Sequence, residues 1–212
     1  MLVKEAKAFG NISNGNTKMP GTTFAVDAFA CKTGAKLAQV EGSVCSKCYA
    51  IRIQKMRPSV DQGYKSNLAK YLASDRKGWI AAIAFQIIRQ NTDGHHRWFD
   101  AGDLQSLEML EDIVSVCKIT PDVKHWLPTR EVKIVSDYLK ANGAFPDNLV
   151  VRVSSPMIDD KPLIRYGNTS TVHTKGKPHH GVECEASKRG NSCGPCRACW
   201  QRDVVNVSYP KH

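Results

Sequence analysis

The sequence predicts an α/β fold, because strand-like and helix-like patterns alternate along the middle of the chain. Between residues 96 and 153, short β-branched and aromatic runs are separated by longer segments whose apolar residues recur at helical spacing. Such alternation is typical of parallel β-α-β units. The chain has 212 residues, of which 42% are hydrophobic and 24% charged, so it is large enough to bury a core.

The first third of the chain predicts an arm, a strand, a loop and two helices. Residues 1–20 are polar and rich in glycine and asparagine, so we expect an irregular arm there. Residues 22–29 alternate small, aromatic and β-branched side chains, which favours a strand. A loop that could fold around a ligand is expected at 31–48, where two glycines occur. Apolar residues at helical spacing then predict helices over 64–72 and 79–89.

Turn residues mark the ends of the elements expected in the middle of the chain. Thr120 and Pro121 stop one helix, Thr129 is placed to cap the next, and Gly143 follows its end. Cys117 continues the apolar stripe of its helix and is expected to be a small buried hydrophobe. The expected elements are a strand at 96–99, a helix at 107–117, a strand at 123–127, a helix at 132–142 and a strand at 149–153.

Three parts of the chain follow from this pattern. Residues 1–20 form the polar arm, and residues 21–160 form a β/α core that includes the first cysteine loop. Residues 161–212 form a cysteine-rich, metal-binding segment packed on that core. We expect no regular structure over 155–200, where metal–ligand bonds would replace an apolar core as the source of order.

Seven of the eight cysteines fall into two groups near opposite ends of the chain. The first group has the spacing C-x13-C-x2-C, and the second has the spacing C-x8-C-x2-C-x2-C. The repeated two-residue gap lets three thiolates from one short loop converge on one inorganic centre. The first group consists of Cys31, Cys45 and Cys48, and the second consists of Cys184, Cys193, Cys196 and Cys199.

Three kinds of chemistry compete for these cysteines. Disulfides suit short secreted chains, whereas this N-terminus has no apolar signal-peptide segment. Structural zinc is the second interpretation, although its ligands usually come as two separated pairs. The C-x2-C-x2-C run is similar to ferredoxin-type cluster loops. The pattern therefore favours one or two iron–sulfur clusters, 4Fe–4S before other types, with zinc as the alternative metal.

The two groups differ in the number of ligands that they offer. The four-cysteine group can close a site by itself, which indicates a structural centre. The three-cysteine group leaves one position for a histidine, a cysteine of the other group or a substrate, and only a substrate gives direct chemistry. His173, His179 and His180 are candidate ligands in the irregular segment, although most loop histidines are simply solvated.

Charge and composition narrow the partners. The formal net charge is +10, with +7 over residues 47–89 and +6 over 161–212 against −5 over 90–160. This distribution suits an anionic small molecule or a nucleic acid, or alternatively compensates the negative charge of thiolate-bound clusters. No apolar run reaches the ~20 residues that span a bilayer, so no membrane partner is expected. Reduced thiols without an export signal favour the cytoplasm.

The carboxyl ends of the expected strands carry polar side chains, and chemistry in barrel-like sheets is found at that edge. Asp100 and Asp103 could orient a substrate amine or hydroxyl, and Arg130 could hold a carboxylate or phosphate. For Asp103 and Thr129, capping of the following helices is an equally good and compatible role. Ser154 and Ser155 follow at the end of the third strand of this region, 149–153. No serine-hydrolase elbow, P-loop or zinc-peptidase motif is present.

Seven motifs are spread along the chain: DAFACKTGAKL at 27–37, GSVCSKCYA at 42–50, RWFDAGDLQ at 97–105, WLPTRE at 126–131, VRVSSPM at 151–157, CGPCRACW at 193–200 and DVVNVSYPKH at 203–212. Together these motifs resemble a family of phage-encoded proteins known as gene product 88. The resemblance covers nearly the whole chain after about residue 18, and the family name carries no established activity.

A second resemblance is to radical S-adenosylmethionine enzymes, whose cluster loop ends in C-x2-C and, in the spore-photolyase-like branch, continues into Tyr-Ala. The run from Cys45 to Ala50 matches that ending, although thirteen residues separate Cys31 from Cys45 where that family usually has three. The resemblance implies a cluster with one open iron that binds S-adenosylmethionine, with Tyr49 and Gly102 at cofactor-binding positions. It also implies a TIM-like β/α barrel, here partial because too few strands are expected.

These observations give one leading hypothesis and two alternatives. The leading hypothesis is a phage iron–sulfur protein of the cytoplasm, whose first cluster gives radical-SAM-like or open-iron chemistry on an unknown substrate. The first alternative is a nucleic-acid-binding module stabilised by iron–sulfur or zinc. The second is a hydrolase that uses an open cluster iron as a Lewis acid and Asp100 or Asp103 as base.

Overall fold

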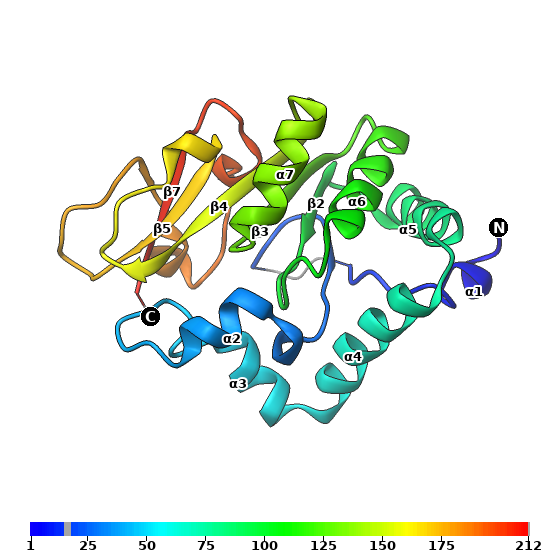
Figure 1. The fold of residues 1–212 in the computed structure, drawn as a ribbon, viewed down its shortest axis with the longest axis horizontal. Coiled ribbons are helices and arrows are strands. Elements are labelled where there is room, and N and C mark those ends of the chain that lie inside the picture. Colours follow the sequence, from blue (N-terminus) through cyan, green and yellow to red (C-terminus); the bar gives the residue numbers. More distant parts are fainter. Residues whose placement is uncertain (15–17, 212) are drawn as a thin grey trace.

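Parallel strands form a single sheet in the computed structural model, which describes residues 1–14 and 18–211. Within these residues the sheet has seven strands in the order β1-β2-β3-β4-β5-β7-β6, and every pairing is parallel (Figure 1). The α/β class with parallel strands is therefore confirmed. The strands are β1 (Thr22–Phe24), β2 (His95–Trp98), β3 (Lys124–Thr129), β4 (Leu149–Ile158), β5 (Thr169–His173), β6 (Val182–Glu183) and β7 (Asn206–Pro210).

The helices form two sets (Figure 1). Helices α5, α6 and α7 lie beside one another across one face of the sheet, while α2 and α3 lie beyond one end of the strands. Helix α4 leads from α3 to α5, and α1 lies near the N-terminus. The α-helices are α1 (Val3–Ala6), α2 (Lys32–Ala38), α3 (Tyr49–Met56), α4 (Pro58–Ala73), α5 (Arg76–Gln90), α6 (Leu107–Ile119) and α7 (Val132–Asn142).

The apolar core lies between the sheet and helices α5 to α7. Helix α6 shows how the sequence produces it, because Leu110, Ile113 and Cys117 recur at helical spacing and all three are fully buried. The expectation that Cys117 is a buried hydrophobe is thus confirmed. The strands contribute the alternate residues Trp98 and Leu127 to the same core.

The other face of the sheet carries the intervening residues of the strands, and the C-terminal segment packs there. Arg97 of β2 is paired in register with Trp126 of β3, and its guanidinium stacks on that ring at 4.6 Å. Trp200 packs edge-on against Trp126 at 5.3 Å and donates its indole N–H to the carbonyl of His96. The segment that carries the second cysteine group therefore lies over the face of the sheet that the helices leave uncovered.

Arg152 of β4 holds this segment in place. Its side chain is fully buried, and its three nitrogens donate to backbone carbonyls only. Nε donates to Cys199 O at 3.0 Å, and Nη2 donates to Ala198 O and Gln201 O at 2.9 and 2.8 Å. Nη1 donates to Val204 O at 2.9 Å, so one guanidinium spans the whole turn. The charge spread over these donors makes each bond stronger than a neutral one.

The structure corrects three expectations about regular structure. The stretch 155–200 is not wholly irregular, because β4 continues to Ile158 and β5 and β6 follow within it. The loop expected at 31–48 contains helix α2, although Gly34 lies within that helix. The arm expected at 1–20 is not wholly irregular, because Val3–Ala6 form helix α1, and Asn11 N donates to Asn67 Oδ1 at 2.8 Å. Residues 15–17 of that arm lie outside the described residues.

We predict that Arg152→Met destabilises the protein by about 4 kcal/mol, because several buried carbonyls lose their charged donor at once. Urea unfolding followed by tryptophan fluorescence measures the effect. The control is Arg89→Met on the exposed side of α5, which should stay within ~0.5 kcal/mol of the parent protein. Equal stability of the two variants would mean that Arg152 does not anchor the segment.

Candidate metal centres

The first cysteine group lies on a segment that is tied to the carboxyl ends of β2, β3 and β4. Thr33 donates its N–H and its hydroxyl to the carboxylate of Glu131, each at 2.9 Å. Val44 N donates to Pro156 O at 2.9 Å beside the end of β4, and Tyr49 donates its hydroxyl to Asp100 O. The segment therefore lies at the carboxyl ends of the strands, which is where the sequence analysis expected reactive side chains.

Two of the three sulfurs of this group lie beside Gly34. A Cβ atom added at Gly34 would lie 3.8 Å from Cys31 Sγ and 3.7 Å from Cys45 Sγ. Cys48 lies close enough for its thiolate to act electrostatically on both of the other two thiols. The absence of a side chain at Gly34 thus leaves the space between two sulfurs open.

Burial dominates the acidity of these thiols. Burial, with smaller contributions from the nearby Asp103 carboxylate and the other two thiolates, raises the pKa of Cys31 to about 12 against a lowering influence of Arg130. Burial also raises the pKa of Cys45, against a lowering influence of Arg130. A positive partner is therefore needed before these sulfurs ionise together at neutral pH.

Asp103 serves as a cross-link between two strand ends. Its Oδ1 accepts from Leu104 N at 2.8 Å and from the Thr129 hydroxyl at 2.6 Å, and its Oδ2 accepts from Arg130 N at 2.9 Å. Burial raises the pKa of Asp103 to about 6, while these donors oppose the rise.

The expected capping roles of Asp103 and Thr129 are corrected. Ser106 caps α6, accepting a hydrogen bond from Met109 N at 3.2 Å. Residue 131 is the N-cap position of α7, and Thr129 accepts the N–H of that residue. Asp103 lies three residues and Thr129 two residues before the actual N-cap, and both side chains join the strand ends instead.

Asp100 differs from Asp103 in having a free oxygen. Its Oδ1 is buried and has no hydrogen-bond partner among the described residues. Nε of Arg130 is likewise buried and without a partner there. Burial raises the pKa of Asp100, whereas the guanidinium of Arg97 lowers it. Of the two predicted acidic residues, Asp100 is thus the one whose carboxylate is available to a ligand.

Gly102 is explained by packing. Its φ is +81°, and a Cβ there would lie 2.4 Å from Cγ2 of Val26. Ser154 and Ser155 are also engaged within the protein, with Ser170 Oγ and with Lys161 O. The cofactor-binding role expected for Gly102 stays a prediction.

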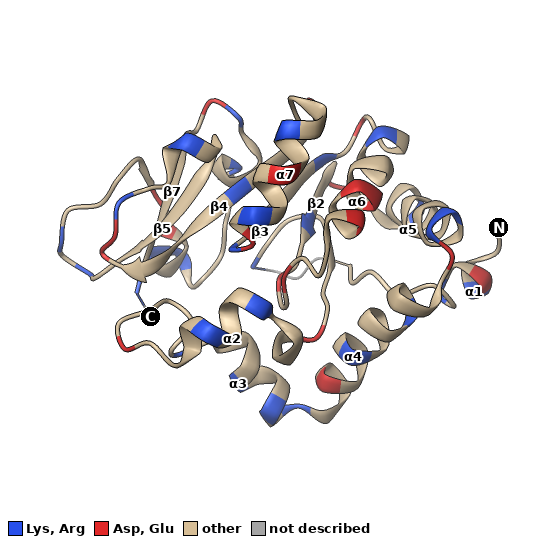
Figure 2. Ribbon diagram, in the orientation of Figure 1, with Lys and Arg blue, Asp and Glu red and all other residues tan. Residues whose placement is uncertain are grey.

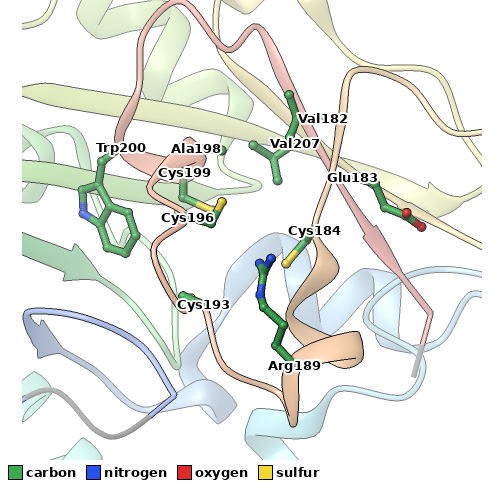
Figure 3. A pocket seen from close by; sticks show the side chains of 10 residues that line it. All are labelled: Val182, Glu183, Cys184, Arg189, Cys193, Cys196, Ala198, Cys199, Trp200 and Val207. Carbon is green, nitrogen blue, oxygen red and sulfur yellow. The ribbon is translucent and has the colours of Figure 1, made fainter.

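The second cysteine group surrounds one pocket (Figure 3). Cys184 N donates to Ser208 O at 2.8 Å, which fixes it beside β7, and Cys196 N donates to Cys193 O at 3.1 Å within the tight turn. Figure 3 shows the guanidinium of Arg189 directed into the space between the cysteines. The pocket is lined by Val182, Glu183, Cys184, Arg189, Cys193, Cys196, Ala198, Cys199, Trp200 and Val207.

Basic and hydroxyl groups surround the thiols of this pocket. Burial raises the pKa of Cys199 to about 11, while the Tyr209 hydroxyl, 3.2 Å from Cys199 Sγ, and Arg152 lower it. Burial likewise raises the pKa of Cys193, which Arg97 lowers. The sequence analysis did not single out Arg97, Arg152 and Tyr209. Each alternates with core residues along its strand, which could have indicated a side chain on the opposite face of the sheet.

All eight cysteines are free thiols. Among the described residues, which include every cysteine, no three sulfurs lie within 4.8 Å of one another. The two groups therefore form neither disulfides nor sulfur cages of single-ion size.

The structure thus defines a parallel α/β protein that carries one cysteine group at the carboxyl edge of its sheet and another in a pocket over the uncovered face. The chain belongs to the gene product 88 family, whose family model matches residues 3–202. No curated protein and no solved structure matches it. Within the described part of the chain, no helix has the length and apolar character needed to cross a bilayer.

We predict that Cys31 in the folded, metal-free protein is alkylated by iodoacetamide at a rate that keeps rising up to pH 11. The thiolate fraction grows about tenfold per pH unit below the pKa, and burial raises that pKa to about 12. Mass spectrometry of the labelled peptide gives the rate. In urea the rate should level off above pH ~9, near the ordinary thiol value. If the rate in the folded protein also levelled off above pH ~9, the raised pKa of Cys31 would be contradicted.

Proposed function

We propose that this phage protein binds two iron–sulfur clusters, one in each cysteine group, and that the second cluster is structural. The observation that carries the proposal is the convergence of four free cysteines from one short segment on a single pocket. Thiolates are the usual ligands of such clusters. Arg152, Arg97 and the Tyr209 hydroxyl supply the positive charge and the hydrogen bond that favour sulfurs in their ionised form.

The spacing of the second group favours a cluster over zinc. Zinc ligands usually come as two separated pairs, whereas Cys193, Cys196 and Cys199 form a C-x2-C-x2-C run. That run is similar to ferredoxin-type cluster loops.

The first cluster is proposed as the reactive one. Three thiolates leave one iron open, and the open position would face the strand ends, where Asp100 has a free carboxylate oxygen and Arg130 a free Nε. Asp100 is the better candidate for a proton-transferring residue, because both oxygens of Asp103 already accept hydrogen bonds. Arg130 would hold an anionic part of the substrate.

Radical-SAM-like chemistry is one form of this proposal. Strands β1 to β5 are neighbours in chain order, which is also the order in β/α barrels, so the open sheet is compatible with a partial barrel. S-adenosylmethionine would bind the open iron, with Tyr49 beside Asp100 at the rim. Production of 5′-deoxyadenosine with reductant distinguishes this chemistry from hydrolysis at an open Lewis-acidic iron.

A nucleic acid is one candidate class of substrate or partner. Lysines and arginines gather on α2, on α3 and at the junction between α3 and α4, near the first cysteine group (Figure 2). Phe29 is 45% exposed there, with the ammonium groups of Lys55 and Lys65 each 6.0 Å from its ring. Basic groups beside an exposed ring suit the phosphates and bases of single strands. The reducing cytoplasm of an infected cell is the proposed location, because both sites need reduced thiols.

Anaerobic purification followed by absorption near 400 nm and by iron and sulfide analysis tests the proposal. We expect both elements in the parent protein and in Cys117→Ala, whose thiol lies in the apolar core away from both sites. We expect Cys196→Ala to lose about half of the iron and sulfide, because only one cluster loses a ligand. A colourless protein with stoichiometric zinc and no sulfide would reject the proposal and favour the zinc-stabilised nucleic-acid-binding alternative.

We predict that Gly34→Leu removes the first cluster and leaves the second, because the added side chain enters the space between Cys31 and Cys45. The matched control is Gly63→Leu in helix α4, where an added Cβ meets nothing within 4 Å. Iron per protein should fall by about half in the first variant only. Full iron content in Gly34→Leu would show that the first group is not a cluster site.

A further inference from the structure

A second kind of donor cluster lies at the ends of β5 and β6, outside both cysteine groups. His173 is the last residue of β5 and Glu183 the last of β6, and β7 runs between these two strands. His179 comes from the connection that joins them. One ligand atom from each of His173, His179 and Glu183 lies within 4.8 Å of the other two.

Hydrogen bonds orient the buried member of this trio. His173 is 3% exposed, and its Nδ1 is 2.8 Å from Ser208 Oγ on β7. Ser208 in turn accepts the hydroxyl of Thr171 at 3.0 Å. Metal-bound imidazoles commonly have their second ring nitrogen held in this way, so Nε2 of His173 is directed at Glu183 by the sheet itself.

We propose that His173, His179 and Glu183 bind one divalent transition-metal ion of the zinc type. Two imidazoles and one carboxylate are a common zinc donor set with an open fourth position. The distance from His173 Nε2 to Glu183 Oε1 is 3.2 Å, close to the ~3.3 Å between two ligands of a tetrahedral zinc ion. His179 needs a modest approach, which its glycine- and proline-containing connection permits.

The neighbouring charges can release Glu183 to an ion. Lys188 Nζ now contacts Glu183 at 3.2 Å, but it also contacts Glu185 at 3.3 Å and keeps that partner when the ion takes Glu183. Glu183 also lines the cysteine pocket, but its carboxylate is directed away from the four cysteines in Figure 3, toward a separate set of ligand atoms. The proposed ion would therefore use none of the cysteines that are assigned to the clusters.

Cobalt and zinc titration of the anaerobically purified protein, after mild chelation, tests this site. We expect one Co2+ per chain with visible d–d bands and without the near-ultraviolet charge-transfer band of thiolate ligands, and displacement by Zn2+. His179→Ala should weaken binding at least about tenfold. This variant is chosen because His179 is exposed and its loss spares the folded core.

His180→Ala is the matched control, since Asn206 hydrogen-bonds only the backbone carbonyl of that residue. The variant should bind cobalt as the parent protein does. Absence of binding, a thiolate band on the bound cobalt, or equal losses in the two variants would overturn the assignment. Iron and sulfide are measured in every sample, so failure of this site and failure of the proposed clusters are separate results.

Discussion

The buried guanidinium of Arg152 is the constraint on which the arrangement of the second site depends. The segment from Cys184 to Gln201 has only short 3-10 turns, so it cannot satisfy its own backbone carbonyls. Arg152 satisfies three of these carbonyls, because its guanidinium donates hydrogen bonds to Ala198 O, Cys199 O and Gln201 O. A charged side chain on a strand thereby becomes the fixed point from which Trp200 and the cysteine pocket are placed.

The second organising feature is the charge distribution between the two cysteine groups. Arg97 stacks on Trp126 and acts electrostatically on Asp100 at the first site and on Cys193 and Cys199 at the second. A buried cation between two sites is costly unless negative charge accompanies it. Thiolate-bound clusters would supply that negative charge, so part of the net positive charge of the chain would compensate them locally.

The sequence predicted those features that depend on local pattern. Alternating periods were sufficient for the parallel α/β class and for the burial of Cys117, and spacing was sufficient to separate the cysteines into two groups. It failed where a residue's role depends on a strand distant in sequence. Asp103 and Thr129 resembled helix caps because nothing local reveals that they bind each other. The role of Arg152 could not be recognised either, because the carbonyls of Ala198, Cys199 and Gln201 become its neighbours only in the folded chain.

The central claim is that this chain holds two separate clusters, one per cysteine group. Diffraction from anaerobically grown crystals at the iron absorption edge measures this directly. The account predicts two anomalous iron peaks or peak groups, one among Cys31, Cys45 and Cys48 and one within the pocket of the second group. A single iron site shared by both groups, or anomalous signal from zinc alone at these sulfurs, would contradict it.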